Sequence, residues 1–120
     1  MKQYEYEEQK ALFRWARLKT TIAKYPGIQL LEGSLNGVHL SKVQAAKAKA
    51  AGLLKGSHDV SLPVARKCFN GLSIEMKYGK NKPTIEQIWY GDMLVKEGWR
   101  VEYCWSFEEA RKVIEEYLDA

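Results

Sequence analysis

Near the middle of the chain runs Gly71-Leu72-Ser73-Ile74-Glu75-Met76-Lys77, in which apolar and polar side chains alternate. A period of two predicts a β-strand and points Glu75 and Lys77 to the same face. A second strand-like run, His58-Asp59-Val60-Ser61-Leu62-Pro63, precedes it. If the two runs pair, Asp59 approaches Glu75, and two carboxylates in one place suit a hard cation such as Mg²⁺. Lys77 would lie beside them, placed to orient a water molecule or to hold a phosphate.

The same residues also allow a purely structural interpretation. A Glu-x-Lys pair is common on the solvated face of a strand. In that case Glu75 and Lys77 would face water and carry no chemistry.

Helical and extended patterns alternate along the rest of the chain. Apolar spacing and capping residues predict helices over 5–19, 42–51, 84–97 and 108–118. Further strands are expected at 28–31 and 99–105, and the Asn36-Gly37 pair suits a tight hairpin. A strand, a helix and a strand over 71–105 imply two parallel strands joined by a crossover. We therefore expect an α/β domain with a small mixed central sheet flanked by helices.

Length and charge bound the class of protein. The 120 residues correspond to a single domain, 1–120, and 46% of them are hydrophobic, which is ordinary for a globular protein. Nineteen basic residues against fifteen acidic ones give a net charge of +4, and the pI is about 9.0. This balance favours an anionic partner, nucleic acid more than an acidic metabolite. Lys42, Lys47 and Lys49 make the helix over 42–51 basic, although a solvated surface also explains them.

Cysteines and the start of the chain indicate the compartment. Cys68 and Cys104 lie far apart and lack metal-site spacing, so neither a zinc site nor a disulfide framework is expected. Cys104 is expected to be a small core residue. The N-terminal segment is polar, and no run approaches the length of a membrane span. We expect a soluble protein of a reducing cytoplasm. Core or interface positions are expected for the tryptophans Trp15, Trp89, Trp99 and Trp105.

Taken in order, the motifs resemble one protein family. They are Glu5-x-x-x-Gln9-Lys10-Ala11-Leu12-Phe13-Arg14-Trp15-Ala16, Asp59-x-x-Leu62-Pro63, Gly71-Leu72-x-Ile74-Glu75-x-Lys77, Thr84-x-x-Gln87, Glu108-Glu109-Ala110 and Ile114-x-x-Tyr117-Leu118. Their order and spacing resemble the VRR-NUC (virus-type replication-repair nuclease) family, a branch of the PD-(D/E)XK nuclease superfamily, over nearly the whole chain. The resemblance implies a restriction-endonuclease-like core. It also implies a phage-type single-domain protein that acts in the cytoplasm of an infected host cell.

The resemblance implies roles for particular residues. Asp59 and Glu75 match the metal-binding acids, and Lys77 matches the catalytic lysine. Glu5 matches an acid on the first helix that completes the metal site. The backbone carbonyl of Met76 would be a further metal ligand, as is common in the superfamily.

Other residues match the family in part. Gln87 matches a glutamine beside the active site, but it is also the expected capping partner of Thr84. Glu5 and Gln9 can equally be an exposed pair one helical turn apart. The proline that usually precedes the first acid is His58 here, a residue that either contacts a phosphate or metal or is a surface or turn histidine. His39 lies where relatives often carry a glycine-rich turn with a basic residue, and it either faces DNA or is a plain loop residue.

The function implied by the resemblance is a Mg²⁺- or Mn²⁺-dependent DNA endonuclease that leaves a 5′-phosphate and a 3′-hydroxyl. Branched DNA such as a four-way junction is the expected substrate, and a homodimer would suit the symmetry of a junction. Candidate interface residues are the aromatics Tyr4, Tyr6, Trp89 and Tyr90. The alternative is a nucleic-acid-binding accessory protein with an inactive site. A metabolic enzyme lacks support, because no phosphate-cradling glycine loop, nucleophile elbow or cofactor lysine motif is present.

Overall fold

A mixed sheet organises this computed structural model, which describes residues 3–34 and 40–119. Within those residues four strands follow the order β1-β2-β3-β4. They are β1 (Glu32–Gly33), β2 (Val60–Leu62), β3 (Leu72–Met76) and β4 (Arg100–Cys104). The pairs β1–β2 and β2–β3 are antiparallel, whereas β3 and β4 are parallel. The predicted mixed sheet and its parallel pair are therefore confirmed.

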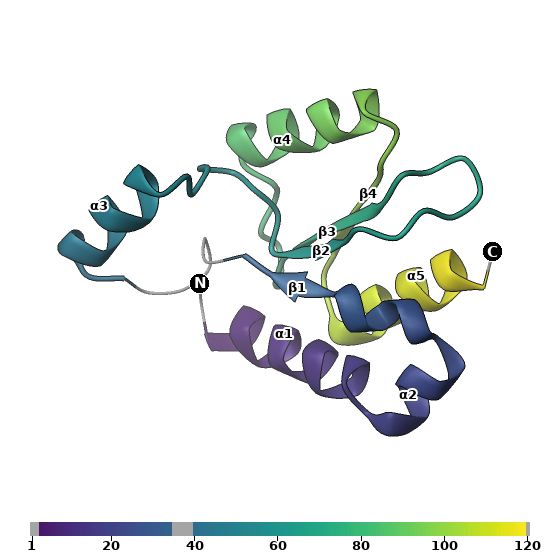
Figure 1. The fold of residues 1–120 in the computed structure, drawn as a ribbon. Helices are drawn as coiled ribbons and strands as arrows, with labels where there is room; N and C mark the ends of the chain where they lie inside the picture. Colours follow the sequence, from purple (N-terminus) through teal and green to yellow (C-terminus); the bar gives the residue numbers. More distant parts are fainter. Residues whose placement is uncertain (1–2, 35–39, 120) are drawn as a thin grey trace.

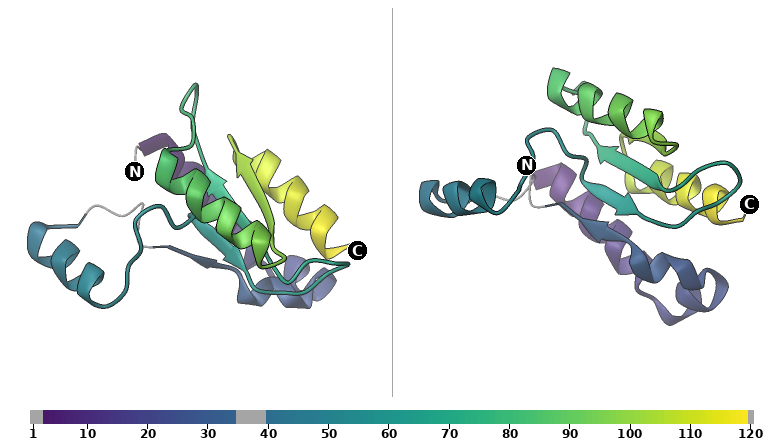
Figure 2. Two further views of the ribbon diagram at one scale, coloured as in Figure 1. Left: turned by 90° about the horizontal axis from the view of Figure 1, so that it is seen from above. Right: turned by 45° about the horizontal axis from the view of Figure 1, so that its top comes forward.

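Helices cover both faces of the sheet, as Figures 1 and 2 show. They are α1 (Gln3–Ala16), α2 (Lys19–Lys24), α3 (Lys42–Ala50), α4 (Ile85–Lys96) and α5 (Phe107–Leu118), with a 3₁₀-helix, η1 (Pro26–Leu30). The helix α4 lies over one face, and α1 and α5 lie over the other (Figure 1). The helix α3 lies apart from the layers. The expected α/β architecture is thus confirmed.

The apolar core lies between the sheet and the pair α1 and α5. Leu72, Ile74 and Met76 of β3 are each about 1% exposed, and Ile114 of α5 and Leu12 of α1 are fully buried. The even-numbered side chains of β3 therefore point into this core, as the period of two requires. Cys104 is buried, as predicted, and Cys68 is exposed.

Two local expectations were wrong. Residues 28–31 do not form a strand. Pro26 presets a helical φ for η1, and the buried residues Ile28 and Leu31 are three apart, which is the period of a 3₁₀-helix. The first helix does not continue to residue 19, because the backbone of Leu18 is extended and separates α1 from α2. Of the two positions expected for Trp89, the core is excluded, since its side chain is 49% exposed, and an interface remains.

Helix capping follows the predictions with one exception. Thr84 with Gln87, and Ser41 with Gln44, form complete capping boxes. Ser106 caps α5 by accepting a hydrogen bond from the backbone N–H of Glu109. The spacing of Ser106 and Glu109 predicts a capping box, but the carboxylate of Glu109 accepts from the backbone N–H of Trp105 instead of that of Ser106, so the box is only half formed. The expected hairpin at Asn36-Gly37 lies outside the described residues.

Candidate active site

The polar face of β3 is enclosed rather than solvated. Ser73, Glu75 and Lys77 alternate with the core residues of the strand, and they are 2%, 3% and 8% exposed. They lie on the face opposite the core, which is the face that α4 covers (Figure 1). The interpretation of Glu75 and Lys77 as a solvated surface pair is therefore wrong.

Pairing of β2 with β3 brings the two acids together. Val60 lies opposite Ile74 in the antiparallel register, so Asp59 comes beside Glu75. The backbone N–H of Asp59 donates to Oε1 of Glu75 at 3.2 Å, and the backbone N–H of Met76 donates to Oδ2 of Asp59 at 2.9 Å. Each carboxylate is thus held by the backbone of the neighbouring strand. The proximity predicted from the sequence is confirmed.

Lys77 and Gln87 hold the second oxygen of Glu75. Nζ of Lys77 lies 3.6 Å from Oε2 of Glu75, and Nε2 of Gln87 donates to the same oxygen at 2.9 Å. The amide oxygen of Gln87 meanwhile accepts from the backbone N–H of Thr84 in the capping box. Gln87 therefore caps α4 with its amide oxygen, as predicted, and holds the carboxylate of Glu75 with its amide nitrogen.

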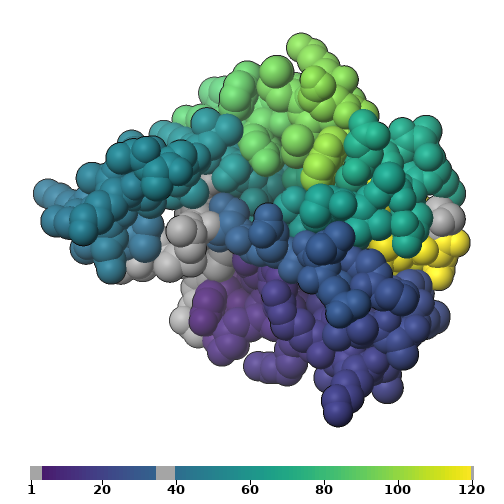
Figure 3. Space-filling view, in the orientation of Figure 1, coloured from purple at the N-terminus to yellow at the C-terminus, as the bar shows by residue number. Residues whose placement is uncertain are grey.

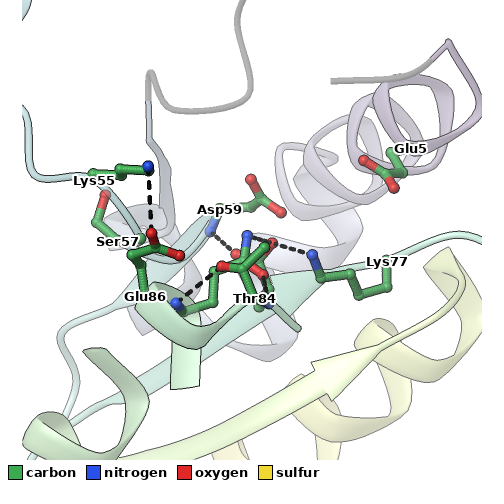
Figure 4. A pocket seen from close by; sticks show the side chains of 10 residues that line it. Glu5, Lys55, Ser57, Asp59, Lys77, Thr84 and Glu86 are labelled. Atoms are coloured by element: carbon green, nitrogen blue, oxygen red, sulfur yellow. Dashed lines mark hydrogen bonds and ion pairs between the residues drawn. The ribbon is translucent and has the colours of Figure 1, made fainter. Parts of the chain in front are cut away.

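Glu5, on α1, lies across from the acid pair Asp59 and Glu75, and all three line one cavity (Figure 4). It is half-buried, and its Oε1 accepts a hydrogen bond from Nδ2 of Asn81 at 3.1 Å. Gln9 is also half-buried, so the two do not form an exposed surface pair. Within 3–34 and 40–119, no three His, Cys, Asp or Glu side chains are grouped closely enough to hold one metal ion. Glu5 is thus near Asp59 and Glu75 without converging on them.

His58 is neither a surface residue nor directed at the cavity. Its side chain is only 4% exposed. Its Nδ1 lies 2.8 Å from Oγ of Ser73, and its Nε2 lies 2.9 Å from the carbonyl oxygen of Gln87. Because that carbonyl can only accept, Nε2 carries the proton and Nδ1 accepts from Ser73. Both earlier interpretations of His58 are therefore wrong, and the residue instead ties the first turn of α4 to the sheet.

Burial sets the protonation of these groups. Burial, and then the negative charge of Asp59, raises the pKa of Glu75 to about 8, although Lys77 opposes the shift. Burial likewise raises the pKa of Asp59, against the hydrogen bond from Met76. Burial lowers the pKa of His58, which keeps that imidazole neutral. The acid pair therefore shares a proton near neutral pH unless a further cation is present.

A cavity of about 390 Å³ opens over these residues (Figure 4). Its lining consists of Glu5, Lys55, Gly56, Ser57, Asp59, Glu75, Lys77, Thr84, Glu86 and Gln87. Four of these residues are acids and two are lysines, so the lining carries a formal charge of −2 when all are ionised. Lys55 pairs with Glu86 at 3.3 Å, which leaves the uncompensated charge with the other three acids and Lys77. A protein with net positive charge thus contains a cavity whose lining is locally negative.

Two supporting residues were not expected from the sequence. Asn81 holds Glu5 through its amide, and its carbonyl oxygen accepts from Nε1 of Trp105 at 2.9 Å. Ser73 could have been noticed as the polar residue two positions before Glu75, on the same face of the strand. His39 lies outside the described residues.

Comparison with known proteins found a solved structure with a similar fold. No protein-family model matches the chain, and no curated protein matches it. A solved structure described as a VRR_NUC domain protein matches with a TM-score of 0.75 and 28% sequence identity. The match covers 99% of this chain and 91% of that one. No helix of the described residues is long and apolar enough to cross a membrane.

The fold and the arrangement of two acids and a lysine define an α/β core of the restriction-endonuclease-like class. Within that class the chain matches a VRR_NUC domain protein along nearly its whole length, which gives it a fold of nuclease type. The family resemblance of the sequence is thereby confirmed.

Proposed function

We propose that this protein is a divalent-metal-dependent DNA endonuclease. The observation that carries the proposal is the buried pair of Asp59 and Glu75, with Lys77 beside it, at the base of a negatively charged cavity. Burying two carboxylates without a full set of cations is costly, so such a pair indicates a function. The similarity to a VRR_NUC domain protein supports the choice of a nuclease.

The residues fit a hard divalent cation. Mg²⁺ and Mn²⁺ prefer oxygen ligands, and Mg²⁺ usually takes one or two protein carboxylates and keeps several water molecules. Asp59 and Glu75 would supply those carboxylates, with Glu5 completing the set, directly or through water. The N–H of Met76 faces Asp59, and its C=O points to the same side of the strand, where it would be a further ligand. When bound, the ion supplies charge neutralisation at the scissile phosphate and a more acidic water.

The chain's own residues position the reactants. Lys77, held by Glu75, would donate to a phosphate oxygen or orient the attacking water. Gln87 keeps Glu75 in one orientation. The water oxygen forms a bond to phosphorus as the bond from phosphorus to the 3′-oxygen breaks. The water gives up a proton to solvent, and the 3′-oxygen takes one up, which leaves a 5′-phosphate and a 3′-hydroxyl.

The test is cleavage of labelled four-way junction, flap and duplex DNA with Mg²⁺ or Mn²⁺. Glu75→Gln and Lys77→Met are expected to lower the rate at least about 100-fold, because each removes a group that acts on the transition state. Glu108→Gln, an exposed acid on α5, is the matched control and should retain full activity. Equal activity of Glu75→Gln and the control would place the chemistry elsewhere.

The proposal also includes branched DNA as the substrate and a homodimer as the oligomeric state. Ile85, Trp89 and Met93 lie four residues apart on α4 and are 85%, 49% and 43% exposed. They form an apolar stripe on the outer face of the helix that carries Gln87. A second copy packed on this stripe would fix the distance between two active sites, as a symmetric junction requires. Tyr4 is less suited to an interface, because its ring stacks on Tyr78 at 4.6 Å.

Sedimentation of Trp89→Glu tests the dimer. The variant is expected to be a monomer that cuts a junction more weakly than the unsubstituted protein does. A monomeric unsubstituted protein would remove the dimer from the proposal.

If DNA binds but no metal supports cleavage, the accessory-protein alternative is correct.

A further inference from the structure

The net positive charge of the protein comes from one segment. Residues 33–58 contain Lys42, Lys47, Lys49 and Lys55 and no Asp or Glu. The whole chain has nineteen basic and fifteen acidic residues, so the remainder carries fifteen of each and is neutral. The net charge of +4 therefore belongs entirely to this segment.

Residues 40–56, which lie within the described part of this segment, form what we call the basic arm. Its helix α3 projects from the body of the molecule (Figure 3). No residue of α3 is buried, and even Val43 is 66% exposed. The helix is well formed all the same, because Ser41 and Gln44 cap it and alanine and lysine favour helix. A helix that buries nothing contributes little to the core, so the arm needs another explanation.

The base of the arm is anchored at the rim of the catalytic cavity. Lys55 pairs with Glu86 on the first turn of α4 (Figure 4). Gly56 has a φ of +91°, and a Cβ there would lie 2.6 Å from the carbonyl oxygen of Glu86. Where the segment leaves and rejoins the sheet, the hydroxyls of Ser34 and Ser57 lie 3.3 Å apart. The arm therefore projects from a fixed point, and its base forms one wall of the cavity.

We infer that the basic arm binds the phosphate backbone of nucleic acid beside the catalytic cavity, an inference that rests on the proposed function. Lys42 and Lys49 are seven residues apart, so they lie on one face of α3 about 10 Å from each other. Lys47 points to another side of the helix. Since a phosphate backbone is a row of negative charges, these lysines can follow one strand without reading its sequence.

Charge favours nucleic acid over a second copy of the chain as the occupant. Two basic arms packed on each other would bring six lysines of α3 together without an acid on either helix. Like charges at such an interface cost free energy and would have to be offset by apolar contacts. The small alanine side chains of α3 supply little apolar area for that purpose.

The test is equilibrium binding of labelled junction and duplex DNA, with Ca²⁺ in place of Mg²⁺ to separate binding from cleavage. The variant carries Lys42→Gln, Lys47→Gln and Lys49→Gln, which keep the helix propensity and remove the charge. The control carries Lys19→Gln, Lys96→Gln and Lys112→Gln, three exposed lysines outside the arm. Both variants lose the same net charge, so a difference in DNA affinity between them shows that the position of the lysines matters.

We expect the arm variant to bind about tenfold more weakly. In a plot of log affinity against log salt concentration, the slope of the arm variant should be smaller in magnitude by about two to three. Each lost phosphate contact accounts for roughly 0.9 of that change. The control should keep nearly the salt slope of the unsubstituted protein.

Three results would overturn the inference. Equal weakening in both variants would show that only net charge matters. Unchanged binding in the arm variant would show that the arm makes no contact with DNA. A change of oligomeric state in the arm variant alone would make the arm an interface between copies. Arm-dependent binding without cleavage by any metal would leave the inference standing and refute the nuclease.

Discussion

Replacing Glu75 with glutamine should stabilise the metal-free protein while it abolishes activity. In the folded protein the pKa of Glu75 is about 8, and its ordinary value is 4.5. At pH 7.5 the unfolded chain has lost this proton and must take it up again on folding. At about 1.4 kcal/mol per pH unit, that uptake costs the unsubstituted protein about 4 kcal/mol. Glutamine avoids this cost because it carries no charge.

Part of the gain is offset by lost hydrogen bonds. Glu75 accepts from the N–H of Asp59 with one oxygen and from the amide of Gln87 with the other. A glutamine has only one acceptor oxygen, so one donor loses its partner at a cost of about 1–3 kcal/mol. The net expectation at pH 7.5 is a gain of about 1–3 kcal/mol in the free energy of unfolding.

The sign of the pH dependence is the stronger test. A raised pKa in the folded state means that Glu75 favours folding below pH 4.5 and that this contribution is lost as the pH rises through about 8. Urea denaturation in a chelating buffer should therefore show the difference between Glu75→Gln and the unsubstituted protein growing from pH 5 to pH 8. Saturating Mn²⁺ should raise the melting temperature of the unsubstituted protein only. A difference that is constant across this pH range would refute the reasoning.

Three further predictions concern the surroundings of the site. His58→Ala should lower the free energy of unfolding by about 2–4 kcal/mol in a urea titration, because two buried hydrogen bonds are lost; a loss under about 1 kcal/mol would contradict the anchoring role. Gly56→Ala should lower the melting temperature more than Gly52→Ala does, since both have positive φ but only Gly56 lies against backbone; equal shifts would show that the contact has no effect. A thiol reagent should modify Cys68 alone in the native protein, because Cys104 is buried and its burial raises the pKa of that thiol to about 12; two reactive thiols per native chain would contradict this placement.

Local patterns account for much of the fold. The alternation over 71–77 and the register with 58–63 depend on sequence spacing, and they bring Asp59 beside Glu75 whatever lies above the sheet. The capping residues Thr84 and Ser41 likewise mark helix starts, through hydrogen bonds between residues three apart in the sequence. The failure at 28–31 has the same local origin, since apolar residues near Pro26 suit a 3₁₀-helix as well as a strand.

By itself the sequence determined the strands β2, β3 and β4, most helix starts and the three residues that define the candidate site. Only the tertiary structure decided that this site is buried, because burial depends on α4, which lies over the polar face of β3. It also decided that His58 anchors Gln87 and that Asn81 holds Glu5, 76 residues away in the chain. The physical reason is the distance along the chain over which each effect acts. Periodicity and capping act between neighbours, whereas desolvation, and with it the raised pKa of Glu75, depends on groups that only the folded chain brings together.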